Sequence, residues 1–249
     1  MDFGLAGKVA LVTGAAGGIG TAIVHALASE GCAVALLDLK RSASLQETCA
    51  ASETQGQRAL MIEADVRSFD RAAEVIEQVV MHFGGLDILV CCAGITRDAV
   101  SWKLAESAWD DVLDVNLKGC FNYARAAAPA LRTRGGGRVV NVSSINGLRG
   151  KFGQANYAAS KAGMIGLSKT LARELGRFGI TVNVVAPGMT ETAMTRTLGD
   201  ESKTAAIAET VLGRLCSPAD IADAVVFLCS QRARQITGEV LRVDAGQYI

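Results

Sequence analysis

Short apolar runs alternate with longer amphipathic stretches along the whole chain, and this alternation constrains the fold more than any other feature. Runs of strand length occupy residues 8–14, 33–39, 58–66, 86–94, 137–144, 180–188 and 238–246. Stretches of helical length lie between them, at residues 18–30, 41–55, 68–83, 107–133, 155–177 and 217–230. The pattern is typical of βαβ units, which build a parallel sheet with right-handed crossovers. We therefore expect one doubly wound α/β domain over residues 1–249, with about seven parallel strands and helices on both faces.

Charge and hydropathy exclude several classes of protein. The 25 basic residues balance the 25 acidic ones, so no strong field attracts nucleic acid or an anionic membrane. No apolar stretch approaches the roughly 20 uncharged residues that a membrane span needs. The N-terminus lacks a basic region before its apolar run, so we expect no signal peptide. The seven cysteines are then expected to be free thiols in a reducing compartment, the cytoplasm.

The first apolar run ends in the glycine-rich segment TGAAGGIG, residues 13–20. Small residues at this point let the backbone turn tightly and approach a diphosphate, while the helix that follows offers free N–H groups to the anion. The glycines at 14, 18 and 20 follow the spacing G-x-x-x-G-x-G rather than G-x-G-x-x-G. Because the segment closes a strand and opens a helix, it predicts dinucleotide binding in a Rossmann-like fold.

The second apolar run ends at Asp38, 18 residues after Gly20. A carboxylate at this place can accept hydrogen bonds from the adenosine ribose hydroxyls and would repel a 2′-phosphate, which favours NAD(H). Lys40 and Arg41 follow closely and soften the repulsion, so NADP(H) stays open, as does a plain helix-capping role for Asp38. At the end of the third run, Asp65 could meet the adenine edge.

A tyrosine and a lysine, Tyr157 and Lys161, lie four residues apart on a predicted helix, and this spacing puts them on one face. A phenol is a poor base at neutral pH, but a nearby ammonium lowers its pKa and lets it exchange a proton with an alcohol or carbonyl oxygen. Ser144 ends the fifth strand, 13 residues before Tyr157, and its hydroxyl can hold the substrate oxygen. Strand alternation should turn the neighbouring Ser143 the other way.

With these motifs the chain resembles the short-chain dehydrogenase/reductase family over nearly its whole length. The resemblance rests on the loop at 13–20, "DVNLKG" around Asn116, Ser144, the pair Tyr157 and Lys161, "PG" at 187–188 and the C-terminal "VDAG". Within the family, "AGITRD" and "GQANYAASKAG" look most like the 3-oxoacyl-[acyl-carrier-protein] reductases.

The resemblance implies the role of each site residue. Tyr157 would be the general acid/base, Lys161 would lower its pKa and hold the nicotinamide ribose, Ser144 would orient the substrate oxygen, and Asn116 would anchor a water that passes protons outward. The residues expected to contact the cofactor are Gly14, Gly17, Gly18, Ile19, Gly20, Asp38, Leu39, Asp65, Val66, Ala93, Gly94, Tyr157, Lys161, Pro187, Gly188, Thr190 and Thr192.

The chain departs from the family pattern in its fourth strand, where relatives carry two asparagines and this sequence has Cys91 and Cys92. Alternation points the two thiols to opposite faces of the sheet, so we expect them to act as small apolar residues and not as a disulfide. The remaining cysteines and the two histidines show no metal-ligand spacing, and no metal site is expected.

The substrate is less well defined than the chemistry. Hydride transfer to or from a 3-oxoacyl or 3-hydroxyacyl thioester is the main expectation, and another secondary alcohol, alicyclic or aliphatic, stays open. A nucleotide-binding subunit without catalysis is a third, remote alternative. Residues 189–215 are expected to form a lid over the substrate, and a packed helix pair stays open as the alternative. Its apolar residues are Met189, Met194, Leu198, Ile207, Val211 and Leu212.

The family resemblance also implies a homo-oligomer, a homotetramer. The long helical stretches 107–133 and 155–177 could pair across a symmetric interface, and the C-terminal strand with its tail could form another.

Overall fold

The computed structural model describes residues 2–192, 195 and 199–249. Its strands are β1 (Val9–Thr13), β2 (Ala33–Asp38), β3 (Ala59–Glu63), β4 (Ile88–Cys91), β5 (Gly137–Val142), β6 (Ile180–Pro187) and β7 (Val240–Val243). Its α-helices are α1 (Gly18–Ser29), α2 (Ala43–Thr54), α3 (Phe69–Phe83), α4 (Glu106–Leu113), α5 (Gly119–Thr133), α6 (Asn146–Arg149), α7 (Ala155–Leu175), α9 (Asp200–Ala208) and α10 (Pro218–Cys229). Short 3-10 turns lie at Ser101–Lys103, Gly176–Phe178 and Gln231–Ala233.

All seven strands pair in parallel, in the order β3-β2-β1-β4-β5-β6-β7. The expected single doubly wound, Rossmann-like domain is therefore confirmed. The strand order reverses between β1 and β4, and ligands of such sheets bind in the crevice at this point, beyond the carboxyl ends of the strands.

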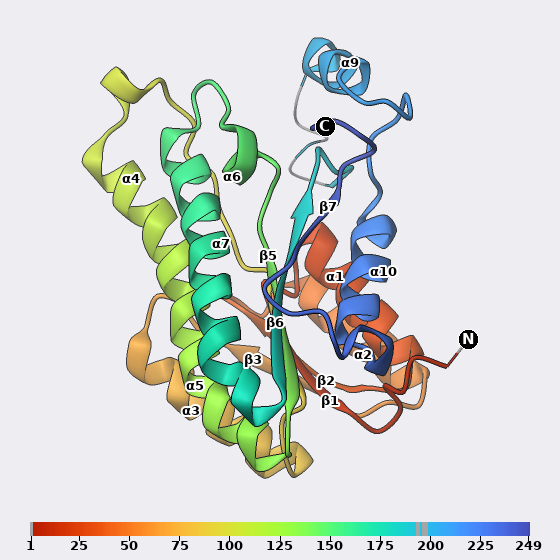
Figure 1. Cartoon of the computed structure of the whole chain (residues 1–249). Helices are drawn as coiled ribbons and strands as arrows, with labels where there is room; N and C mark the ends of the chain where they lie inside the picture. Colours follow the sequence, from red (N-terminus) through yellow and green to blue (C-terminus); the bar gives the residue numbers. More distant parts are fainter. Residues whose placement is uncertain (1, 193–194, 196–198) are drawn as a thin grey trace.

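Helices cover both faces of the sheet (Figure 1). One hydrophobic cluster joins β1, β2 and β4 to α1 and α10, and a second joins the same strands to α3, α5 and α7. The central strands are buried on both faces, which is why their sequences are continuous apolar runs rather than alternating ones. This core fixes the strand ends that carry the polar residues.

The prediction of one continuous helix over 107–133 is wrong in detail. The chain forms α4, then a π-helical segment η2 (Asp114–Lys118), then α5. A π-helical turn widens the helix by one residue and is frequent at functional sites. Here it contains the buried Asn116. The short helix α6 was not expected either, and α9 lies in the stretch 189–215, where a lid or a packed helix pair was expected.

Candidate active site

The glycine-rich loop packs against the end of β4 and leaves no room for side chains. Gly14 has φ +70°, and a Cβ there would lie 2.7 Å from the Ala93 backbone. A Cβ on Gly20 would lie 2.1 Å from the Gly14 carbonyl oxygen. Gly17, the N-cap of α1, provides no side-chain cap, so N–H groups of the first turn stay available to an anion. The loop therefore fits the diphosphate of a dinucleotide.

Asp38 lies beside this loop at the end of β2. One carboxylate oxygen accepts a hydrogen bond from the Ala16 N–H at 2.9 Å, and the other accepts one from the Leu39 N–H at 2.8 Å. Two backbone donors thus hold the carboxylate in place where the adenosine ribose is expected. The alternative of a plain helix cap is not what the structure shows, because Ser42 caps α2.

Asp65 and Val66 follow β3 and have partners of their own. Arg67 forms an ion pair with Asp65 at 2.7 Å, and hydrogen bonds from Arg67 lower the pKa of this carboxyl group. The Val66 carbonyl accepts a hydrogen bond from the side chain of Asn122 at 2.9 Å. Contact of Asp65 with the adenine stays a prediction.

A hydroxyl of the glycine-rich loop holds the end of β4. The Thr13 hydroxyl oxygen accepts hydrogen bonds from the N–H groups of Cys92 and Ala93, both at 3.2 Å. As expected, the two thiols face opposite sides of the sheet: Cys91 belongs to the cluster with α5, and Cys92 packs against the cluster with α1. Burial raises the pKa of Cys92 to about 11, although Lys161 lowers it, so this thiol stays neutral.

Gly94 lies where Asn116 and Lys161 approach the end of β4. A Cβ on Gly94 would be 3.3 Å from the Asn116 amide oxygen and 3.5 Å from the Lys161 Nζ. The Asn116 side chain accepts a hydrogen bond from the Ile95 N–H at 2.8 Å and donates to the Ser160 hydroxyl at 3.0 Å. Asn116 therefore ties the β4 loop to α7, the helix of Tyr157.

Ser144, Tyr157 and Lys161 come together beyond the end of β5. Ser144 follows the strand, and its side chain lies near enough to the Tyr157 hydroxyl to lower the pKa of that group. Lys161 is 4% exposed, and its Nζ lies 5.7 Å from the centre of the Tyr157 ring. The neighbouring Ser143 donates a hydrogen bond from its hydroxyl to the Lys161 carbonyl of α7 at 2.9 Å.

The pKa of Tyr157 differs from the expectation that a nearby ammonium lowers it. Burial raises this pKa to about 12, and the Ser144 side chain opposes the rise. The Lys161 ammonium instead donates to the Val142 carbonyl at 2.7 Å, and burial lowers its own pKa. The phenol is thus protonated at neutral pH.

The nicotinamide end of the predicted site follows β6. Pro187 ends the strand, Gly188 donates its N–H to the Val243 carbonyl at 2.9 Å, and the Thr190 hydroxyl donates to the Gly188 carbonyl at 3.1 Å. Thr192 reaches back to the glycine-rich loop, since a Cβ on Gly18 would lie 3.1 Å from its Cγ2. The predicted lid residues Met194 and Leu198 lie outside the described residues.

Sequence reasoning missed a set of polar residues between Ser144 and Tyr157. Asn146 donates its N–H to the Ser144 hydroxyl at 3.1 Å and its side-chain amide to Gln154 at 3.0 Å. Gln154 in turn donates to Asp98 at 2.8 Å. The sequence contains these residues in the run "NGLRGKFGQ". Its polar residues follow neither a helical nor a strand period, so the run predicts no regular element. These residues hold the loop that carries Ser144.

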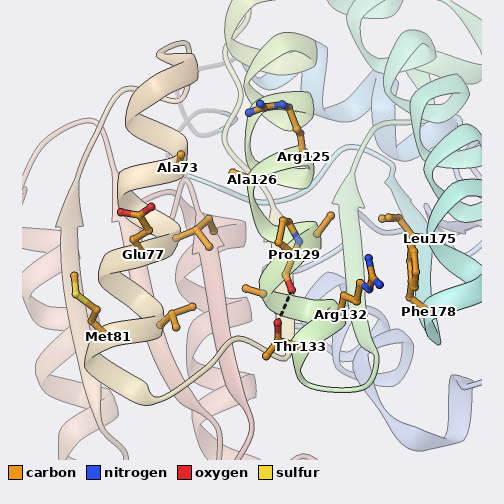
Figure 2. A pocket seen from close by; sticks show the side chains of 14 residues that line it. Ala73, Glu77, Met81, Arg125, Ala126, Pro129, Arg132, Thr133, Leu175 and Phe178 are labelled. Carbon is orange, nitrogen blue, oxygen red and sulfur yellow. Dashed lines mark hydrogen bonds between the residues drawn. The ribbon is translucent and has the colours of Figure 1, made fainter.

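A broad groove elsewhere on the molecule is not part of this site. It lies between α3 and α5 and near the end of α7, lined by Ala73, Glu77, Arg125, Pro129 and Leu175 among others (Figure 2). None of the predicted site residues lines it. Among the described residues, no group of histidine, cysteine or acidic side chains could hold a metal ion, and no helix is long and apolar enough to span a membrane.

Comparison with known proteins agrees with this geometry. A family model described as "Enoyl-(Acyl carrier protein) reductase" matches residues 14–247. The acetoacetyl-CoA reductase of Allochromatium vinosum is 41% identical over 97% of this chain and 99% of its own. The 3-oxoacyl-[acyl-carrier-protein] reductase FabG of Staphylococcus aureus is 43% identical over 97% of this chain and 98% of its own. The FabG of Vibrio cholerae is 43% identical over 98% of this chain and 99% of its own.

A solved structure supports the same assignment. A short-chain alcohol dehydrogenase from Sinorhizobium meliloti superposes with a TM-score of 0.93 at 38% sequence identity, covering 99% of this chain and 98% of its own. With sequence relatives and fold in agreement over nearly the full length, the chain belongs to the short-chain dehydrogenase/reductase family and is an oxidoreductase.

Proposed function

We propose that the protein reduces the ketone of a 3-oxoacyl thioester to the 3-hydroxyacyl thioester, reversibly, with NADH. The observation that carries the proposal is the proximity of Ser144 and Tyr157, with Lys161 beside them, at the same sheet edge as the glycine-rich loop. The relatives named above as acetoacetyl-CoA and 3-oxoacyl-[acyl-carrier-protein] reductases support this substrate class.

The residues at the strand ends fit a nicotinamide dinucleotide. The loop from Gly14 to Gly20 would hold the diphosphate, Asp38 the adenosine ribose, and Pro187 to Thr192 the nicotinamide end. When bound, such a cofactor supplies or accepts the hydride. The chain itself contributes position and a proton donor.

Tyr157 supplies the proton for reduction. Its phenol is protonated and partly buried, and Ser144 lies beside it, so both hydroxyls can point to one substrate oxygen. As that oxygen gains charge, Tyr157 donates its proton and Ser144 its hydrogen bond. For Lys161 to stabilise the phenolate that is left, its ammonium has to turn from the Val142 carbonyl toward the phenol. Asn116 keeps α7 in register with the β4 loop.

Asp38 supports a preference for NADH over NADPH. Its carboxylate is fixed by two backbone N–H groups, and Glu63 lies close by, since it accepts a hydrogen bond from the Arg41 N–H at 3.3 Å. A 2′-phosphate would meet these carboxylates. Lys40 and Arg41 offset part of the repulsion, and NADPH use is the alternative.

A substrate panel with NADH tests the reaction class. We expect acetoacetyl-CoA to give the highest kcat/KM, above crotonyl-CoA, an enoyl thioester, and cyclohexanone, an alicyclic ketone. A hydroxyl pair built around one oxygen suits a carbonyl better than a carbon–carbon double bond. Highest activity on the enoyl thioester would overturn the carbonyl mechanism, and highest activity on the alicyclic ketone would favour the other secondary alcohols.

The proposal extends to assembly and location. We propose a homotetramer, in which the outer faces of α4, α5 and α7 pair between subunits. Trp109 and Phe121 remain 38% and 40% exposed on α4 and α5, which supports such an interface. Sedimentation that shows a stable, active monomer would contradict it. Seven free thiols suit a reducing compartment, and we propose the cytoplasm.

A further inference from the structure

Three segments around the proposed substrate site meet at one polar junction, formed by Arg149, Glu209 and Gln247. Arg149 is the last residue of α6, Glu209 follows α9, and Gln247 belongs to the C-terminal tail. Figure 1 shows α6, α9 and the C-terminus on the same side of the molecule, beyond the strand ends. These residues are 60 and 38 positions apart in the chain, so the junction is purely tertiary.

The hydrogen bonds of the junction form a closed triangle. Arg149 donates to the Glu209 carboxylate at 2.9 Å and to the Gln247 carbonyl at 3.3 Å. The Gln247 side-chain amide donates to the same Glu209 oxygen at 2.9 Å. Each residue therefore contacts the other two, and no single pair can move alone.

The junction reaches the reacting groups on two sides. On one side, Arg149 donates to the Asn146 amide oxygen at 3.3 Å, and the Asn146 N–H holds the Ser144 hydroxyl. On the other side, the Gln247 amide oxygen accepts a hydrogen bond from the Met189 N–H at 2.9 Å, directly after Gly188. Gln247 is only 8% exposed, so this second connection is shielded from water.

The tail is held to the same segment by a strained residue. Ala245 has φ +54°, the only non-glycine residue with positive φ among those described. Its carbonyl accepts hydrogen bonds from the N–H groups of Val211 at 3.0 Å and Leu212 at 3.1 Å. A left-handed alanine persists only where its surroundings over-determine it. The tail is thus built to hold residues 209–212 in place.

We infer that Arg149 is a positioning residue of the reaction: through Glu209 and Gln247 it fixes the segment after α9 over the substrate, and through Asn146 it fixes the loop of Ser144. The inference rests on the proposed function and on the expectation that the segment after α9 lies over the substrate. It assigns Arg149 itself to the substrate side, because its side chain bonds neither the glycine-rich loop nor residues 187–192, and only Gln247 reaches the nicotinamide end.

The test compares Arg149→Met, Glu209→Gln and the double variant with a matched control, Arg71→Met. Arg71 forms an ion pair with Glu74 at 2.8 Å on the exposed side of α3, where no site residue lies. We measure kcat and KM for acetoacetyl-CoA, the Kd of NADH, and the hydrogen exchange of the Val211 and Leu212 amides in the full chain.

We expect Arg149→Met to raise KM about three- to fivefold, the size of one partly exposed ion pair, with the Kd of NADH unchanged within about twofold. The double variant should be no worse than Arg149→Met alone, because the two residues act through one junction. Exchange at Val211 and Leu212 should quicken, and Arg71→Met should change none of these quantities.

Two results would overturn the inference. One is an unchanged KM in Arg149→Met, whether or not the exchange rates change, because the junction would then only tether the tail. The other is a double variant whose KM rises by the product of the single effects. If the unmodified protein does not turn over acetoacetyl-CoA, the proposed substrate is wrong, and faster exchange at Val211 and Leu212 in Arg149→Met still tests the junction.

Discussion

The two halves of the site are held together by different means. The cofactor half, formed by the glycine-rich loop and Asp38, is held by close backbone contacts. Gly14 lies against Ala93 and Gly20 against the Gly14 carbonyl, and two backbone N–H groups fix the Asp38 carboxylate. On the substrate half, side chains on three segments hold one another through Arg149, Glu209 and Gln247, with Glu209 half exposed. A family can therefore keep the first half constant while it changes substrates by replacing a few side chains in the second.

The largest effect is expected where the halves meet, at Tyr157. Tyr157→Phe removes the only proton that the phenol can donate but leaves the glycine-rich loop untouched. We expect kcat to fall about 10²- to 10⁴-fold, with the Kd of NADH within about twofold of the original. Steady-state kinetics and fluorescence titration of NADH measure both. A kcat within tenfold of the original would remove Tyr157 from the mechanism.

One added methyl group, in Gly20→Ala, should disrupt the close packing of the glycine-rich loop. The Cβ of Gly20→Ala would lie 2.1 Å from the Gly14 carbonyl oxygen, so the loop must shift. We expect a loss of about 1–3 kcal/mol in the free energy of unfolding, and a corresponding weakening of NADH binding. Denaturant unfolding and NADH titration measure these two quantities.

Gly17→Ala is the matched control for the loop. Its φ of −77° suits alanine, and its Cβ would stand 3.4 Å from the same oxygen, an ordinary contact. The free energy of unfolding should change by less than about 0.5 kcal/mol. Equal losses in the two variants would contradict the close packing described for Gly20.

A substitution at Asp38 tests whether this residue sets the preference for NADH over NADPH. Asp38→Ala removes both the acceptor for the ribose hydroxyls and the repulsion of a 2′-phosphate. We expect the ratio of the Kd values for NADPH and NADH to fall about tenfold, with kcat for acetoacetyl-CoA at saturating cofactor unchanged within about twofold. If the ratio does not change, another residue sets the preference.

The smallest effect belongs to the core beneath the cofactor half, at Tyr123. This residue is fully buried, and its hydroxyl finds no hydrogen-bond partner among the described residues. Tyr123→Phe should therefore raise the free energy of unfolding by about 0.5–1 kcal/mol, measured by denaturant unfolding. A loss above about 1 kcal/mol would show that the hydroxyl is satisfied.

The same substitution should alter stability at high pH. Burial raises the pKa of Tyr123 above its ordinary value of 10.0, so the folded state holds this proton more tightly than the unfolded state. The stabilisation is complete below pH 10 and is lost as the pH rises above it. Tyr123→Phe should therefore lose less stability between pH 10 and pH 11 than the unmodified protein.

Most of the fold and the centre of the site were predictable from local patterns. Seven apolar runs gave seven strands, and the placement of Ser144, Tyr157 and Lys161 followed from their positions at a strand end and on one helix face. The π-helical segment at Asn116 has no periodic signature, so a continuous helix was expected there. The sequence also could not show that the Thr13 hydroxyl holds the end of β4 at Cys92 and Ala93.

The substrate half was harder to predict for a physical reason. Arg149, Glu209 and Gln247 are polar residues from separate segments, and only the tertiary fold brings them together. The pKa of Tyr157 could not be predicted from the sequence pattern either. It depends on burial and on whether the Lys161 ammonium donates to the phenol or, as here, to the Val142 carbonyl.

A single-turnover experiment tests the central claim most directly. The protein is loaded with NADH and mixed with excess acetoacetyl-CoA, and both the loss of NADH absorbance and the 3-hydroxybutyryl-CoA formed are followed. The account predicts one hydroxyacyl product for each bound NADH consumed. Tight binding of NADH without its oxidation, or oxidation that yields no hydroxyacyl product, would contradict it.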